Sequence, residues 1–545
     1  MKKLMIGAAA IALLTACGES ADEAVEETVV DVAEAGELAA ASAEDAFAEL
    51  GNIVLRRGNA ASASEALAAM SLDTSGAGRL SFASSDTDDD GASFVDVEIT
   101  VPDEDGSIMI GELVLDGLDM VDGQASFSKL SLNNIQMVPG DEAAADDGTL
   151  NVGNIELLNP SPELASWVAS LMGEGEPADF PEGDAVSFDK WSLSDLNFAM
   201  DDGADTADFN IASIELGNVA EQTMAVARIS DISLTGSSEG EGPFTMSLGS
   251  MTTTGADLAF LDVVRENFDD EDELASALME LSSENPVDPG YDSFSLDTFN
   301  LNFDGVAVDV PSLDINITRN DDGVPIANRT LPFTMSLSAD ADAGEAGSEL
   351  AGALGMVGYE TVEISGEGQS AYDPDTDKLS FDTDNNYLTV ADGFTMQFGG
   401  EVEGYSALSG LDFAAMADGG EPDADLMEEA LSELILHDFT LVLDDDSMVD
   451  RVFNLVAAQT GDDPSALRQQ AVAMTSMAPM MAAGSGVDVN ILTEASGAIA
   501  EFLQTPGTLT ISLNPSEPIS AATFADMEDP SAITKDFLGL SITHE

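Results

Sequence analysis

The chain has 545 residues, of which 105 are acidic and 15 basic, so its formal net charge at pH 7 is −90. A surface this negative repels nucleic acid and anionic lipid headgroups, because proteins that bind either of them use basic patches. Hydrophobic residues make up 44% of the chain and recur in patterned runs, which excludes a wholly disordered protein. The length predicts two to four domains or one long repetitive architecture.

The first residues have the order of a secretory signal. Lys2 and Lys3 precede an apolar run from Leu4 to Leu14, and small residues follow it. The run is too short to cross a bilayer, which takes about 20 residues. We therefore expect residues 1–16 to be a signal peptide.

The end of this segment, Leu14-Thr15-Ala16-Cys17, resembles the lipobox of bacterial lipoproteins. The resemblance implies cleavage before Cys17 and acylation of its sulfur and its new amine, and two or three acyl chains anchor a protein firmly. Gly18 stands where an aspartate commonly retains lipoproteins at the inner membrane, so the resemblance implies the outer membrane. An ordinary signal peptide with a chance cysteine is the alternative.

After the anchor, we expect an acidic tether over residues 17–38 and a helical lead-in over residues 39–76. Strand patterns then dominate between about Ser93 and Phe398. We divide this part into three β modules, with terminal helices in the first two: residues 77–185, 186–290 and 291–420. Helices are predicted within them at Ser161–Met172, Asp270–Leu281 and Ser348–Met356, the first with a serine cap followed by proline.

Many of the predicted strands repeat a step of five residues, in which two alternating apolar residues are followed by a polar or small pair. One such run is Val186, Phe188, Trp191, Leu193, Leu196 and Phe198. Simple strand alternation has a period of two, so the step predicts a bulge or bend at each intervening pair. These pairs are rich in Gly, Asn, Asp and Ser, as at Gly111-Glu112, Asp116-Gly117, Ser194-Asp195 and Gly217-Asn218.

The segment Pro-Phe-Thr-Met-Ser-Leu occurs twice, at Pro243–Leu248 and Pro332–Leu337, and Gly393–Phe398 is nearly a third copy. Phe, Met and Leu alternate with Thr and Ser, as in a strand with one buried face. We interpret the copies as the same core strand used in successive sheet-building modules. The predicted fold class is mainly β with helical inserts (α+β), a long bent antiparallel sheet built from repeated modules.

Residues 421–545 are predicted to be a helical C-terminal region with closing strands. The segments 439–470 (FTLVLDDDSMVDRVFNLVAAQTGDDPSALRQQ) and 509–520 (LTISLNPSEPIS) resemble uncharacterised exported proteins of Gram-negative bacteria. The resemblance implies no activity. The predicted elements are helices at Glu421–Leu436, Ser447–Gln459, Asp463–Ala483 and Ile491–Gln504, and strands at Leu509–Leu513 and Phe537–Thr543.

The usual catalytic constellations are missing from the sequence. It has two histidines, His437 and His544, and its single cysteine is assigned to the lipid anchor. It also lacks a glycine-rich phosphate loop and a His/Cys metal cluster. We assign no catalytic residue, and a carboxylate-dependent hydrolase is kept as a third hypothesis because acids are abundant.

The best candidate for a binding site is the acidic loop Ser84–Phe94. Its alternating Asp86, Asp88 and Asp90 lead into Gly91, a pattern that supplies several oxygens to a calcium ion. Counted from Asp86 as the first position, the twelfth position is Val97, where an EF-hand requires glutamate. The pattern therefore resembles the looser calcium loops found between strands. A solvated acidic loop is the competing interpretation, since chance triplets are expected in so acidic a chain.

Other distinctive side chains are predicted to pack in the core. A methionine cluster could bind copper, but it follows a helical apolar pattern, so we favour packing. The same expectation holds for both tryptophans. The residues concerned are Met474, Met477, Met480, Met481, Trp167 and Trp191.

The sequence therefore predicts a non-enzymatic lipoprotein, anchored through Cys17 to the outer membrane with its body in the periplasm. We expect it to bind or scaffold in the envelope, its curved sheet cradling an apolar ligand such as lipid or contacting an envelope protein. The alternative is a surface-exposed, calcium-dependent structural or adhesive protein. Nucleic acid is not an expected partner.

Overall fold

A computed structural model describes most of the chain after residue 46. The described residues are 47–48, 50–76, 79–100, 107–138, 148–173, 178–181, 183–201, 206–238, 242–258, 286–410, 432–481, 488–520, 522–523 and 533–545. The predicted signal peptide, Cys17, the acidic tether and the helix expected at Asp270–Leu281 lie outside them. So does most of the helix expected at Glu421–Leu436.

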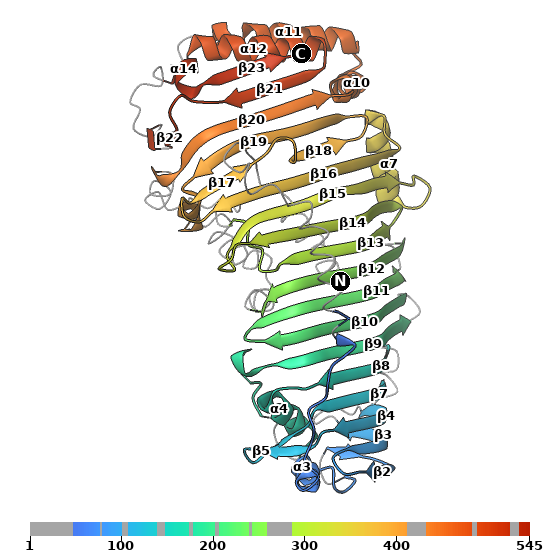
Figure 1. Cartoon of the computed structure of the whole chain (residues 1–545). Helices are drawn as coiled ribbons and strands as arrows, with labels where there is room; N and C mark the ends of the chain where they lie inside the picture. The colour runs from blue at the N-terminus through green and yellow to red at the C-terminus, as the bar shows by residue number, and fades with distance from the viewer. Residues whose placement is uncertain are drawn as a thin grey trace. The chain divides into compact units, whose positions relative to one another are not determined.

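The described strands form one long antiparallel sheet of 21 strands, with a separate two-stranded hairpin. This confirms the predicted fold class, and Figure 1 shows the succession of strands. None of the described helices is long and apolar enough to span a bilayer. The chain divides into two compact units: an N-terminal unit of Leu38–Ala259 and Tyr291–Asp309, and a C-terminal unit that includes Val310–Glu545.

In the N-terminal unit the strands run as an antiparallel meander, each long strand pairing with the next along the chain. The β5–β6 hairpin stands apart as its own small sheet. The elements are α3 (Ala63–Ala69), β1 (Leu80–Ser81), β2 (Ser84–Thr87), β3 (Ala92–Thr100), β4 (Ser107–Asp116), β5 (Asp119–Val121), β6 (Gln124–Ser126), β7 (Lys129–Val138), β8 (Thr149–Leu158), α4 (Pro162–Met172), a 3₁₀ turn (Gly183–Ala185), β9 (Phe188–Asp201), β10 (Thr206–Ala220), β11 (Thr223–Ser238), β12 (Gly242–Asp257) and β13 (Ser293–Phe303).

One residue in each of nine neighbouring strands drops out of the ladder at the same level of the sheet. On β8 and β9, for example, Val152 pairs with Leu196 and Asn154 pairs with Ser194, so that Gly153 faces Asp195 unpaired. The nine residues, which we call the first bend row, are Asp96, Gly111, Asn134, Gly153, Asp195, Ala212, Asp231, Gly249 and Thr298.

Two kinds of residue alternate along the first bend row. Every second strand contributes a residue in the left-handed region, mostly the Asp or Asn that tolerates it; these are Asp96, Asn134, Asp195, Asp231 and Thr298, with φ between 50° and 57°. The strands between them contribute glycine or alanine. A Cβ on Gly153 would lie 2.8 Å from the Cβ of Asp195, so the small residue makes room for its neighbour.

A second bend row lies six residues from the first, later in the chain on one strand and earlier on the next, because the strands are antiparallel. Its left-handed members are Gly117, Asn159, Asn218 and Gly255, with φ between 48° and 65°. They alternate across the sheet with Ser128, Asp189, Ala225 and Asp292, which are not left-handed. The predicted bends at Asp116-Gly117, Ser194-Asp195 and Gly217-Asn218 are therefore confirmed, and Gly111 faces the left-handed Asn134.

The bend rows explain the five-residue step. Both strands of a pair carry one extra residue at the same level, so the pairing of the residues on either side of the bend stays in register. Within each strand, however, the extra residue shifts the alternation by one, so that residues three apart across the bend point to the same face. Leu193 and Leu196 therefore point to the same side of the sheet and pack against one core cluster, as do Ile110 and Leu113. The apolar pentads thus build a single continuous apolar face.

The C-terminal unit continues an antiparallel meander from β15 to β23. Its ladder has one-sided irregularities: β15 carries an extra residue between Thr330 and Phe333, and β20 carries an extra residue, His437, opposite the junction of Glu401 and Val402 on β19. The elements are β14 (Val306–Arg319, which begins in the N-terminal unit), β15 (Pro325–Ala339), α7 (Glu345–Val357), β16 (Thr361–Asp373), β17 (Lys378–Phe381), β18 (Tyr387–Val390), β19 (Phe394–Glu403), a 3₁₀ turn (Tyr405–Gly410), β20 (Ile435–Asp445), α10 (Met448–Thr460), α11 (Pro464–Met481), α12 (Val489–Gln504), β21 (Thr508–Leu513), β22 (Ile519–Ser520), α14 (Lys535–Leu538) and β23 (Leu540–His544).

The predicted C-terminal helices are found at α10, α11 and α12, and the closing strands at β21 and β23. One prediction is wrong at its end: the helix expected at Glu421–Leu436 cannot extend to Leu436, because β20 begins at Ile435. The apolar run Ile435-Leu436 pairs with β19 and with β22, so sheet formation prevails over helical periodicity there.

Both copies of the repeated hexapeptide are strands, in β12 and β15. In each, the phenylalanine ring covers a glycine on the neighbouring strand: a Cβ on Gly236 would lie 2.6 Å from the Phe244 ring, and one on Gly366 would lie 3.0 Å from the Phe333 ring. The proline precedes each phenylalanine at the start of β12 or at the irregularity of β15, where a missing N–H is tolerated. In both copies the repeated phenylalanine therefore serves to cover a glycine on the neighbouring strand.

Candidate apolar ligand site

Helix α4 covers the apolar face of the N-terminal unit. Ser161 caps its first turn by accepting a hydrogen bond from the Leu164 N–H at 3.3 Å, and Pro162 follows at the first helical position. The Ser161 hydroxyl also donates to the Ala185 carbonyl at 2.7 Å, which ties the helix to the chain entering β9. The helix predicted at Ser161–Met172 is thereby confirmed.

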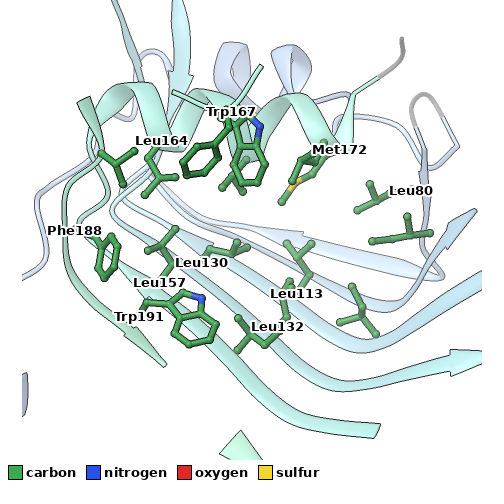
Figure 2. A pocket seen from close by; sticks show the side chains of 17 residues that line it. Leu80, Leu113, Leu130, Leu132, Leu157, Leu164, Trp167, Met172, Phe188 and Trp191 are labelled. Carbon is green, nitrogen blue, oxygen red and sulfur yellow. The ribbon is translucent and has the colours of Figure 1, made fainter. Parts of the chain in front are cut away.

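A cavity of about 360 Å³ lies between α4 and the sheet, as Figure 2 shows. Its volume lies within the range of about 300–1,000 Å³ that is usual for small-molecule sites. Strands β3, β4, β7, β8 and β9 supply most of its floor and α4 its roof. The lining residues are Leu80, Ile99, Ile110, Leu113, Leu130, Leu132, Ile155, Leu157, Leu164, Trp167, Val168, Leu171, Met172, Phe180, Val186, Phe188 and Trp191.

Every residue that lines the α4 cavity is apolar, and the indole nitrogens of Trp167 and Trp191 are the sole polar side-chain atoms among them. Such a lining neither orients a charged substrate nor activates a nucleophile, because both tasks need polar groups that face the ligand. It can hold a hydrocarbon by removing it from water.

Two of the lining residues, Leu171 and Phe180, are exposed to solvent and mark the opening of the α4 cavity. The Phe180 ring packs edge-to-face on Trp167 with 4.9 Å between the ring centroids. Exposed apolar side chains at the edge of an apolar cavity are typical of a site that interacts with an apolar partner.

Charged groups of the same strands pair with one another outside the cavity. Lys129 on β7 lies 3.3 Å from Glu156 on β8, and Lys190 on β9 lies 2.9 Å from Glu215 on β10. Neighbouring residues in the chain, such as Leu130 and Leu157, line the cavity. The alternation of the strands thus separates a charged face from an apolar one.

The structure places the predicted calcium residues in the β2–β3 hairpin. Asp86 is exposed on β2, whereas the Asp88 carboxylate accepts hydrogen bonds from the N–H groups of Asp90 and Gly91. The Asp90 carboxylate accepts one from the Gly58 N–H at 3.0 Å. Among the described residues, no group of three or more acids, histidines or cysteines is placed to hold a metal. Calcium binding by this loop stays a prediction.

The predicted burial of the methionine cluster is wrong. Met474, Met477 and Met480 lie on α11 as expected, but their exposed fractions are 63%, 49% and 69%. The two tryptophans do pack against the core cluster, and both line the α4 cavity.

A polar cluster in the C-terminal unit was not foreseen from the sequence. Glu401, 6% exposed, forms an ion pair with Lys378 and lies 3.3 Å from the Nδ1 atom of His437. The other ring nitrogen of His437 lies 2.9 Å from Glu403. The sequence does not predict this cluster, because its residues lie far apart in the chain and come together only when β17, β19 and β20 pair in the sheet. These contacts occupy each of the groups, which favours a structural role.

A smaller apolar pocket of about 340 Å³ lies in the C-terminal unit between β20, α10 and α12. Its lining includes Leu443, Val449, Phe453 and Phe502, with one acid, Asp445. Burial raises the pKa of the Asp445 carboxyl, which accepts a hydrogen bond from the Val449 N–H at 2.9 Å. Asp445 therefore holds the first turn of α10.

Comparison with known proteins adds one finding on family. A family model described as "Uncharacterized protein" matches residues 387–545, which is less than a third of the chain. No curated protein and no solved structure matches the sequence or the fold.

Proposed function

We propose that the protein is a non-enzymatic, lipid-anchored protein of the bacterial outer membrane that holds an apolar chain in the α4 cavity. The observation that carries the proposal is the cavity itself, which is entirely apolar in its lining and opens between Leu171 and Phe180. The anchor is assigned to Cys17, with the body in the periplasm, on the lipobox resemblance alone.

The apolar lining of the cavity supports a hydrocarbon in preference to a polar ligand. A polar ligand buried among leucine, isoleucine and valine would lose its hydrogen bonds to water without replacement, which costs several kcal/mol. A hydrocarbon instead gains about 0.8 kcal/mol for each buried CH₂ group. A ligand with a polar head would leave the head at the opening and insert its chain.

Two measurements test the proposal. Native mass spectrometry of the purified protein should detect a co-purifying lipid or fatty acid. Titration with the fluorescent fatty acid cis-parinaric acid should show saturable binding that Val168→Trp, which fills the cavity from α4, weakens about tenfold or more. Val95→Trp on β3 makes the same substitution at an exposed position outside the cavity, and it should bind like the unsubstituted protein.

Leu171→Trp serves as a second variant, because the exposed opening accepts a large side chain without unfolding the core. Equal fluorescence titrations for Val168→Trp, Leu171→Trp and Val95→Trp, with the melting temperatures unchanged, would refute the cavity as the ligand site.

A further inference from the structure

The exposed side of α11 carries a row of methionines. Met474, Met477 and Met480 are spaced three residues apart, so they follow one side of the helix, and about half or more of each side chain is exposed. We call these three residues the methionine face. Large exposed apolar groups of this kind usually mark an interaction surface when they are contiguous.

The methionine face coincides with the longest stretch of the chain that lacks acids. No Asp or Glu occurs in residues 464–487, a run of 24 residues between Asp463 and Asp488, in a chain with 105 acidic residues. The one charged residue of α11, Arg468, forms an ion pair with Asp450 and stacks on the Phe453 ring at 5.2 Å. The exposed side of the helix is therefore uncharged.

We propose that the methionine face docks onto the surface of a lipid bilayer. The proposal rests in part on the proposed function, because a protein that takes up an apolar chain must meet the membrane from which the chain comes. The docking proposal goes further by identifying the methionine face as the part of the chain that contacts the membrane.

The chemistry of the face favours a bilayer over a protein partner. Binding hot spots between proteins are rich in Trp, Tyr and Arg, whereas the exposed residues of α11 are Ala, Gln, Ser and Met. Methionine side chains are unbranched and flexible, which suits a fluid surface that has no fixed shape.

The charge distribution favours the same contact. Anionic headgroups repel acidic segments, so the acid-free stretch is the part of the chain that approaches a bilayer at the lowest electrostatic cost. A weak contact is sufficient, since an acyl anchor keeps the protein at the membrane and raises its effective concentration there. Docking then fixes which side of the C-terminal unit faces the lipid.

Flotation with vesicles tests the inference. The protein is the full chain after residue 16 with Cys17→Ser, so that no acyl anchor masks the contact, and the probes are vesicles of phosphatidylcholine with and without phosphatidylglycerol. We expect Met474→Glu, Met477→Glu and Met480→Glu together to lower the vesicle-bound fraction about tenfold. The matched control Val54→Glu, Met137→Glu and Met356→Glu adds the same charge at three other exposed apolar positions and should change the bound fraction little.

A second readout does not depend on the triple variant folding. Met477→Trp should shift its fluorescence emission to shorter wavelength when phosphatidylcholine vesicles are added, whereas Met356→Trp on α7 should not. Equal flotation of the two triple variants, equal shifts of the two tryptophan variants, or self-association through the methionine face without vesicle binding would overturn the proposal.

The two proposals fail separately. Val168→Trp should lose cis-parinaric acid and still float with vesicles, because the α4 cavity and α11 belong to different units. Loss of vesicle binding in the methionine triple variant, with cis-parinaric acid binding retained, is the matching expectation for the docking surface.

Discussion

The two units build the same antiparallel meander but bend their strands in different ways. In the N-terminal unit the extra residues come in facing pairs, aligned in two bend rows across neighbouring strands. In the C-terminal unit the extra residues of β15 and β20 lie on one strand of a pair, and left-handed residues are found at turns and helix ends such as Gly358, Asp377 and Asp392.

This difference has a consequence for the apolar face. Paired extra residues reverse the side-chain alternation on both strands at once, so successive apolar pentads stay on one side and form the floor of the α4 cavity. A one-sided bulge bends the strand locally without carrying the reversal across the sheet. The apolar face of the N-terminal unit thus depends on its paired bends, whereas contacts of single side chains such as Arg451 and Glu494 connect elements of the C-terminal unit.

The largest expected effect comes from adding a side chain to a bend row. Gly117 has φ +65°, and a Cβ there would lie 2.7 Å from the Ser128 Cβ and 2.8 Å from the Arg56 carbonyl oxygen. Because the backbone cannot yield easily, Gly117→Ala should lower the free energy of unfolding by about 3–5 kcal/mol. Urea denaturation measures the change.

Gly123 provides the matched control for that experiment. It also has a left-handed φ, +84°, but no atom lies within 4 Å of its added Cβ. Gly123→Ala should cost about 1–2 kcal/mol, which is the conformational strain alone. Equal losses for the two variants would show that the bend row imposes no steric requirement.

Arg451 tests the dependence of the C-terminal unit on side chains. Its guanidinium donates to the carbonyls of Val357 and Gly358 at 2.8 Å each and stacks on the Tyr359 ring at 4.0 Å, which connects α10 to the end of α7. Arg451→Met should lower the free energy of unfolding by about 2–4 kcal/mol, because the freed carbonyls lose a charged donor.

The control is Arg468→Met, which removes the same charge from an ion pair with the exposed Asp450. Exposed ion pairs contribute little, so we expect a loss of about 1 kcal/mol or less. Equal denaturation midpoints for Arg451→Met and Arg468→Met would contradict the expectation that Arg451 contributes more to stability.

The bends of the sheet could be predicted from the sequence, whereas their effect on the apolar face could not. Asp195 and Gly117 are the residue types that a bend requires, and the five-residue step placed them correctly. The preservation of one face, however, depends on the residue across the ladder, such as Gly153 opposite Asp195, and strand register is not visible in a single strand's pattern.

The two candidate binding surfaces escaped prediction for related reasons. Trp167 and Trp191 were expected in the core, but the space between them depends on how closely α4 packs on the sheet. The sequence predicts the helix that carries Met474 but places its methionines in the core, whereas Met474, Met477 and Met480 are exposed. Alanine and methionine fill most of α11, so charged residues do not mark the solvent side, and the periodicity that predicts a helix leaves its buried face undetermined.

The smallest expected effect, a pH dependence, sharpens the view that side-chain contacts support the C-terminal unit. Glu494 on α12 accepts hydrogen bonds from the Lys535 ammonium and, at 3.0 Å, from the Ile542 N–H. These bonds, with that of Lys535 the stronger, lower the pKa of the Glu494 carboxyl in the folded protein. The stabilisation is therefore present above the ordinary carboxyl pKa and is lost as the pH falls through the lower pKa of the folded state.

Glu494→Gln should therefore reduce the free energy of unfolding by about 1 kcal/mol near neutral pH, since both side chains are partly exposed. The difference from the unsubstituted protein should vanish in acid, below the pKa of folded Glu494, as measured by thermal melting across pH. Glu501→Gln on the same helix removes an equal charge and should leave the pH profile unchanged. If both variants shift the profile alike, the effect reflects the net charge of −90 and not the contact with Lys535.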